Sequence, residues 1–412
     1  MDSVTLFVQD RAGRPLANKA LRVRLQLSGW RRLPDGSSLP CHDYLQRLVR
    51  TDAQGKAPLA LGFAFEGTWR ATLISGEAQM LALSQSEDTL TVFEPPDRFL
   101  ADGTPLWEPT RGKKGPVVLV LMGFDASNAF TATQMMQLMA PATDLIRAAG
   151  GSVAIVRFPD SQLLPETLAP RAQQAIRTLA ADMRERVAVV GISTGGLTAR
   201  IALTDRSLPV RTLVTYDTPH RGANLNPQLQ ALIRRYAGPS MQHPLDSPIT
   251  QAILRDYATK VHWKKRGLAD WPEQVITRPW TPPSLPDWPR WCRTVALSNG
   301  PRHGINHSQT LLRLWQPFRQ ERVLARPEDQ QPGSLLSGLA GFSTALPLGI
   351  AGAEIRELPT FIPTESALDA PADTPPPVDA FFCVPDGAAP LLHDQLSEAA
   401  AHFLFYQILH SA

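Results

Sequence analysis

A serine between two glycines follows a short apolar run and precedes a helical pattern. The run Val187-Ala-Val-Val190 is typical of a strand buried on both faces. After it, Leu197 and Ile201 are four positions apart, as on one face of a helix. Between the two lies Gly191-Ile-Ser-Thr-Gly195, a G-x-S-x-G sequence. This context predicts that Ser193 lies at a sharp strand-to-helix turn, as a nucleophilic serine requires.

Acyl transfer through such a serine needs further groups. A base must take the hydroxyl proton, a carboxylate must orient and charge that base, and donors must stabilise the oxyanion. Gly191 and Gly195 lack a Cβ and so permit the tight turn. The N-terminus of the following helix favours the developing negative charge. The other groups must come from elsewhere in the chain.

The elements around Ser193 predict an α/β fold. Buried strands at 116–122, 153–156 and 210–215 alternate with helical stretches such as 170–183. Strands that alternate with helices at this spacing indicate a parallel, doubly wound sheet.

A second motif, Thr218-Pro-His-Arg-Gly222, follows the strand at 210–215. With G-x-S-x-G-G before it, the chain from about 116 to 410 resembles the α/β-hydrolase superfamily, and within it the bacterial lipases and related lipase-like proteins. The resemblance implies a mostly parallel sheet with cap or lid insertions, which we expect at about 224–290, in helical pieces, and at 301–357. It implies no cofactor.

The resemblance also suggests the base. In α/β hydrolases the catalytic histidine follows the last strand and precedes the final helix, and His393 has that place. His402 and His410 lie in or at the end of the helix and are less well placed. In the resembling lipases the histidine of the T-P-H-x-G motif, here His220, is structural.

The acid is less well defined than the base. The order serine, acid, histidine favours Asp369, which follows a strand-like stretch at 360–362. The alternatives are Asp217, Glu365, Asp379 and Asp386. Asp217 follows the strand at 210–215, but a carboxylate beside Thr218-Pro219 also suits a turn.

The oxyanion hole is expected to use the N–H of Thr194 and that of Phe124, in the loop after the strand at 116–122. Here Met122-Gly-Phe-Asp125 replaces the His-Gly of the common lipase pattern. His303 and His307 have a spacing that would suit a metal on a helix, but Gly304 favours a loop, so we expect no metal site.

Residues 1–95 show short alternating strand patterns separated by turn signals, which predict a small β-sandwich. Gly13-Arg-Pro-Leu-Ala17 and Thr51-Asp-Ala-Gln-Gly55 resemble carboxypeptidase-regulatory-like and bacterial Ig-like modules. Such an accessory domain suits a spacer, a delivery module or a site for a protein partner. Residues 96–115, rich in Pro, Gly and charge, are expected to link it to the catalytic domain at 116–412.

The amino-acid composition limits the kinds of partner and cellular location that we expect. The 412 residues include 41 basic and 38 acidic side chains, interspersed, which excludes a nucleic-acid partner. The three widely spaced cysteines are expected to be reduced. The N-terminus lacks the features of a signal peptide, so we expect a cytoplasmic protein or export by a signal-independent route. The uncharged run Gly333 to Gly352 is too interrupted for a transmembrane helix and suggests a lid or a peripheral membrane contact.

These observations predict a serine hydrolase of carboxylic esters, with Ser193, His393 and Asp369 as its triad. The resemblance, the tryptophans between 263 and 291 and the uncharged run favour a lipase or phospholipase. Two alternatives stay open. One is a hydrolase-fold binding or adaptor protein without catalysis, and the other, with the same chemistry, is an antibacterial lipase effector.

Overall fold

The structure is a computed structural model in which two compact units are described separately, one on Met1–Phe99 and one on Leu100–Ala126 and Met135–Ala412. The described residues are 3–7, 15, 17–32, 38–60, 64–76, 97–110, 112, 114–124, 135–136, 138–158, 161–236, 245–266, 269–304, 310–316, 319–335, 352–355, 360–393 and 395–410.

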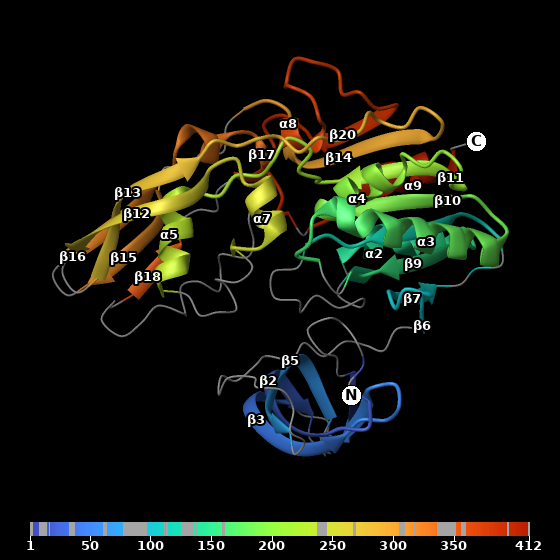
Figure 1. Cartoon of the computed structure of the whole chain (residues 1–412), viewed down its shortest axis with the longest axis horizontal. Coiled ribbons are helices and arrows are strands. Elements are labelled where there is room, and N and C mark those ends of the chain that lie inside the picture. The colour runs from blue at the N-terminus through green and yellow to red at the C-terminus, as the bar shows by residue number, and fades with distance from the viewer. Residues whose placement is uncertain are drawn as a thin grey trace. The chain divides into compact units, whose positions relative to one another are not determined.

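The first unit is all β in its described residues (Figure 1). One antiparallel sheet pairs β1 with β4, and another has the strand order β3-β2-β5. The strands are β1 (Ser3–Phe7), β2 (Ala20–Arg32), β3 (Ser38–Arg50), β4 (Lys56–Ala60) and β5 (Ala64–Gly76). Asp52 closes the turn before β4 by accepting hydrogen bonds from the N–H groups of Gln54 and Lys56, both at 2.8 Å. The packing of the two sheets as a sandwich stays a prediction.

The second unit contains, in its described residues, seven strands of an eight-stranded sheet of order β20-β14-β11-β10-β8-β9-β7-β6; the eighth, β6, ends at the boundary between the units. Neighbours from β20 to β9 are parallel, and β7 is antiparallel to β9. The strands are β6 (Arg98–Phe99), β7 (Pro105–Thr110), β8 (Val117–Leu121), β9 (Ser152–Val156), β10 (Val187–Ile192), β11 (Val210–Tyr216), β14 (Arg293–Pro301) and β20 (Ala380–Val384). The predicted mostly parallel α/β sheet is confirmed.

The stretch expected to be a linker, 96–115, instead contributes two strands to this sheet. Leu106 and Trp107 of β7 are buried and pair with Val156 and Ile155 of β9. The prolines and glycines around them, typical of a linker, are tolerated because β7 lies toward the outer side of the sheet. Composition alone therefore concealed a strand whose apolar residues belong to the core.

Helices cover both faces of the sheet (Figure 1). They are α2 (Ala140–Ala148), α3 (Pro165–Met183), α4 (Thr194–Ala202) and α9 (Glu398–Leu409). The connections from β9 to β10 and from β10 to β11 move across the sheet in the same direction, so right-handed crossovers place their helices, α3 and α4, on the same face. The connection from β8 to β9 moves in the opposite direction, which places α2 on the other face. In agreement, α3 packs against α4, and α2 packs against α9.

The region expected as helical pieces, 224–290, contains in its described residues two helices and also a β-hairpin, and more strands follow it up to residue 367. The inserted elements are α5 (Pro227–Tyr236), α7 (Pro248–Ile253), β12 (Tyr257–Arg266), β13 (Ala269–Arg278), β15 (Thr310–Gln316), β16 (Arg319–Leu324), the 3-10 helix η1 (Pro327–Gln330), β17 (Gly333–Leu335), β18 (Gly352–Ile355), β19 (Thr360–Pro363) and α8 (Thr364–Ala367). The β12–β13 hairpin lies beside α5 (Figure 1). Its Tyr257, Val261, Trp263 and Val275 favour strand over helix.

Most of the uncharged run, from 336 to 351, lies outside the described residues. In the part of the chain that the structure describes, no helix combines the length and apolar character that a membrane crossing requires.

Close packing at the start of α4 explains one glycine of the serine motif. A Cβ on Gly195 would lie 2.3 Å from the carbonyl oxygen of Leu121 and 2.9 Å from that of Met122. Both are main-chain atoms and cannot rotate away. The absence of a side chain at Gly195 thus lets α4 begin directly against the end of β8.

Gly195→Ala is expected to destabilise the protein, although the same exchange inside an unobstructed helix raises the free energy of unfolding by about 1 kcal/mol. Overpacking against two carbonyls predicts a loss of about 1–3 kcal/mol or more in the free energy of unfolding. Urea unfolding would measure it. Ala181→Gly, at an exposed position of α3, calibrates the effect of helix propensity alone. An unchanged or higher midpoint for Gly195→Ala would contradict this packing argument.

Candidate active site

Ser193 lies at the turn between β10 and α4 and has a strained backbone. Its φ is 52° and its ψ is −130°, a conformation that costs a non-glycine residue about 1–3 kcal/mol. Its N–H donates to the carbonyl of Tyr216 at 2.9 Å, and its carbonyl accepts from Gly196 at 3.0 Å. The turn that the motif predicts is therefore present, and hydrogen bonds to the neighbouring strand and helix support it.

The loop after β8 passes directly against this turn. A Cβ on Gly123 would lie 2.6 Å from the carbonyl oxygen of Ile192 and 2.8 Å from the Cβ of Ser193. Only a glycine allows this approach. The next residue, Phe124, is thereby brought beside the start of α4, where an oxyanion donor was expected.

The two expected oxyanion donors differ in their availability. Thr194 is the first residue of α4, so its N–H has no partner within that helix. The N–H of Phe124 donates to Oγ1 of Thr194 at 2.6 Å. An oxyanion could use the Phe124 donor only by displacing the Thr194 hydroxyl.

The carboxylate that contacts His393 belongs to Asp217. Nδ1 of His393 donates to Oδ2 of Asp217 at 2.5 Å, and the Asp217 side chain is fully buried. Oδ1 of Asp217 accepts from the N–H of Asn299 at 3.1 Å. With the Nδ1 proton hydrogen bonded to Asp217, the neutral tautomer of His393 has its lone pair on Nε2, which can act as a base.

Parallel pairing brings Ser193 and Asp217 to the same edge of the sheet. Ile192 pairs with Tyr216, so the next residue of each strand lies at the carboxyl end. His393 is placed there by the loop before α9, and its ring makes a T-shaped contact with Phe361 at a centroid distance of 5.1 Å. The Ser193 hydroxyl makes no hydrogen bond to His393, although both residues are described; such contacts often tighten only when substrate binds.

Asp369, expected as the acid, has other partners. Its carboxylate accepts from Arg200 at 2.8 Å, from the indole N–H of Trp288 at 2.9 Å and from Arg221 at 3.2 Å. Burial opposes its ionisation, but the charge of Arg200 and the hydrogen bonds that Arg200 and Trp288 donate hold the pKa of Asp369 below its usual value. The prediction of Asp369 beside His393 is wrong in this geometry, because two arginines hold the carboxylate elsewhere.

The other acidic alternatives also have partners of their own. Glu365 pairs with Arg255 at 2.9 Å, and Asp379 accepts from the N–H of Thr294 at 2.7 Å. Asp386 pairs with Nδ1 of His303 at 2.9 Å. Sequence reasoning undervalued Asp217, although one signal was present: it follows the strand that succeeds the Ser193 strand.

His220 is a buried neutral histidine that supports the structure. Nδ1 lies 3.3 Å from a guanidinium nitrogen of Arg200, and Nε2 lies 3.3 Å from Oγ1 of Thr215. Since arginine can only donate, Nδ1 accepts and Nε2 carries the proton. Burial, and then the charge of Arg200, lower the pKa of His220 to about 3. The structural role implied by the resemblance agrees with these contacts.

His303 is an exposed histidine between two carboxylates. Its Nδ1 lies 2.9 Å from Asp386 and its Nε2 lies 3.5 Å from Asp373. The hydrogen bond with Asp386 raises the pKa of His303. His307 lies outside the described residues. Within the described residues, no three His, Cys, Asp or Glu side chains gather in a way that could hold a metal ion.

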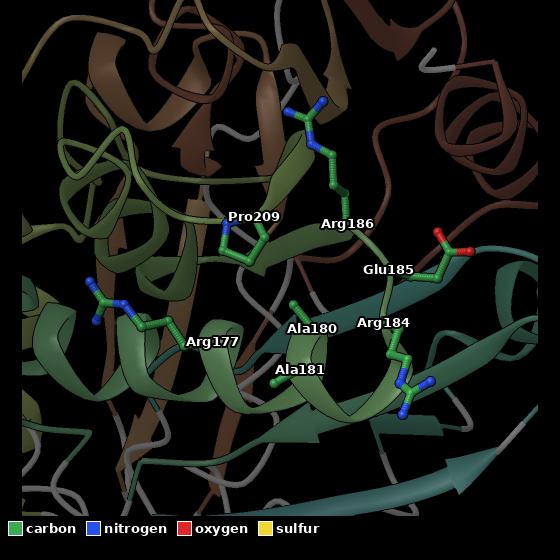
Figure 2. Close-up of a pocket in the computed structure, with 7 residues that line it drawn as sticks. All are labelled: Arg177, Ala180, Ala181, Arg184, Glu185, Arg186 and Pro209. Carbon is green, nitrogen blue, oxygen red and sulfur yellow. The ribbon is translucent and has the colours of Figure 1, made fainter.

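A surface pocket lies at the other end of the strands (Figure 2). It is lined by Arg177 and Ala180 of α3, by Arg184–Arg186 before β10 and by Pro209 before β11. Ser193 and Asp217 follow the carboxyl ends of these two strands, so the pocket is at the opposite edge of the sheet. Open α/β sheets bind ligands at the carboxyl edge, which excludes this pocket as the place of the Ser193 chemistry.

Fold and site together define a mixed α/β protein with a serine turn and an Asp–His pair at one sheet edge. No family model matches the chain, and no curated protein matches it. Solved structures that are similar include a mature lipase of Bacillus licheniformis, at 19% identity and a TM-score of 0.22 over 34% of this chain and 49% of that one.

Two further solved structures are similar. An esterase of the archaeon Pyrobaculum calidifontis is 20% identical, with a TM-score of 0.24 over 36% of this chain and 53% of that one. A lidless α/β serine hydrolase of Xanthomonas campestris is 13% identical, with a TM-score of 0.23 over 28% and 56%. The chain thus spans about half the length of these structures.

His220 is expected to stay neutral in the folded protein down to about pH 3. Its folded pKa is below the unfolded value of 6.5, so the unfolded state binds a proton first and stability is lost as the pH falls between these values. The free energy of unfolding falls by at most about 1.4 kcal/mol for each pH unit. Urea unfolding of the protein and of His220→Gln between pH 7 and 4 measures the difference. An NMR titration with a His220 pKa near 6.5 would contradict it.

Proposed function

We propose that the protein hydrolyses carboxylic esters through an acyl-enzyme on Ser193. The observation that carries this proposal is the hydrogen bond between the buried Asp217 carboxylate and His393, at the sheet edge where the strained Ser193 turn lies. A carboxylate paired with a histidine beside a serine on a strand-to-helix turn is the arrangement that acyl transfer needs.

Each residue then has one task. Oγ of Ser193 attacks the ester carbonyl while Nε2 of His393 takes its proton, and the resulting imidazolium is stabilised by Asp217. His393 gives this proton to the departing alcohol. Water, deprotonated by His393, then attacks the acyl-enzyme, and the proton returns to Ser193 as the acid is released. The N–H of Thr194 supports the oxyanion in both steps.

A lipid ester is the substrate class that we favour. The uncharged run from Gly333 to Gly352 begins in β17, whose Leu335 is hydrogen bonded to the main chain of His393 at 2.9 Å. An apolar segment that starts beside the base is suited to contact an acyl chain. The acyl-chain preference and the head group are open to experiment.

The first test is covalent labelling with a fluorophosphonate, which reacts with activated serines. We expect the protein to be labelled and Ser193→Ala to be unlabelled, because the mutant lacks the attacking oxygen. Ser207→Ala, at a hydroxyl that hydrogen bonds to Asp205 on the surface, is the matched control and should be labelled like the unmodified protein. Equal labelling of Ser193→Ala, or none of the unmodified protein, would sink the proposal. Esters of short and long acyl chains then separate esterase from lipase.

Two isosteric exchanges identify the acid. Asp217→Asn leaves the shape but removes the charge that holds His393 in its tautomer, and we expect kcat to fall by about 10³–10⁴-fold. Asp369→Asn breaks the contacts with Arg200 and Arg221, so it should lower the unfolding midpoint and leave kcat of the folded protein within a few-fold. Steady-state hydrolysis and thermal unfolding of both variants measure this. If Asp369→Asn lowered kcat more than Asp217→Asn does, Asp369 would be the acid.

A further inference from the structure

Asn299 is a buried residue of β14 that contacts both the acid and the loop of the base. It is 1% exposed, and its main-chain N–H donates to Oδ1 of Asp217. Its carbonyl accepts from the N–H of Leu391 at 2.9 Å. The main chain of Asn299 thus joins Asp217 to the segment that carries His393.

The side chain of Asn299 holds the same segment at two further points. Its amide nitrogen lies 2.7 Å from the carbonyl oxygen of Leu392 and 2.8 Å from that of Gln395. The hydroxyl of Tyr216, which is 2.7 Å from this nitrogen, donates to the same Gln395 carbonyl. These contacts lie on both sides of His393 in the sequence.

Donor chemistry explains why an asparagine suits this position. Two main-chain carbonyls point at Asn299, and each needs a donor once it is taken out of water. The two N–H groups of the Asn299 amide can serve the Leu392 carbonyl and the Tyr216 hydroxyl oxygen. The Tyr216 hydroxyl then donates its own proton to the Gln395 carbonyl. An aliphatic side chain would remove these donors and leave the Leu392 carbonyl with the N–H of Gln395, at 3.1 Å, and a carboxylate would repel both carbonyls.

Main-chain hydrogen bonds with β17 also hold the segment at and before His393. The N–H of Leu335 donates to the carbonyl of Leu391 at 3.0 Å, and the N–H of His393 donates to the carbonyl of Leu335 at 2.9 Å. These two bonds fix the loop along β17 but do not reach Gln395. The donors of Asn299 and Tyr216 are what tie the segment after His393 to the central sheet.

We propose that Asn299, together with Tyr216, is a positioning residue for His393, an inference that rests on the proposed function. It keeps the imidazole in line with Asp217 and its Nε2 directed toward the Ser193 turn, without contacting substrate. Because a misplacement of about 1 Å can cost about 100-fold in rate, small shifts of the loop would be visible in kcat.

Three variants test this proposal. Asn299→Ala keeps the main-chain contact with Asp217 and removes the side-chain donors, and Tyr216→Phe removes one hydroxyl. Asn226→Ala is the matched control, since Asn226 is also buried and its amide donates to Asp329 at 2.8 Å and to the carbonyl of Leu324 at 3.2 Å. With p-nitrophenyl butyrate we expect kcat to fall about 10- to 100-fold in Asn299→Ala, with KM within about 3-fold. Tyr216→Phe should show a smaller loss, and Asn226→Ala none.

An NMR measurement makes the test independent of turnover. The Nδ1 proton shared by His393 and Asp217 should give a strongly downfield resonance that is retained in Asn226→Ala and weakened or lost in Asn299→Ala. If the unmodified protein hydrolyses no ester, the proposed function fails while this resonance still decides the positioning role. If Asn299→Ala does not fold, Tyr216→Phe decides it. An unchanged resonance and kcat in the folded variants, or an equal kcat loss in Asn226→Ala, would overturn the inference.

Discussion

The hydrogen bond between Asp217 and His393 is the interaction on which the candidate site depends. It joins residues 176 positions apart, and each partner is held by a different part of the fold. Asp217 follows β11, whose parallel pairing with β10 also places the Ser193 turn. His393 is held by Leu335 and Asn299. Any change that shifts the end of β11, β14 or β17 therefore changes the geometry of the base.

Two carboxylates, the buried Asp217 and the partly buried Asp369, differ in chemistry because they differ in partners. Asp217 faces a histidine, whose imidazole can take and return a proton at Nε2. Asp369 faces Arg200 and Arg221, which remain charged, so its contacts hold α4 and the loop after β11 together. Both residues are carboxylates, and the nature of the partner separates a site carboxylate from a structural one.

Local patterns account for what sequence reasoning recovered. The strand at 187–190, the turn at Ser193 and the helix after it follow from residue types within a few positions of one another, and the structure has them as β10, the elbow and α4. Where the signal was composition rather than periodicity, it misled. Prolines made 96–115 look like a linker, and loose patterning hid the β12–β13 hairpin.

The sequence by itself determined the α/β class, the serine turn and the place of His393 before the last helix, because each depends on residues that are neighbours in the chain. Tertiary structure decided which carboxylate meets that histidine and which side chain holds its loop. Asp217 follows β11 and Asn299 lies in β14, with a long insertion between them in the sequence. Only the parallel pairing of β11 with β14 brings the two residues together. Spacing along the chain contains no record of that contact.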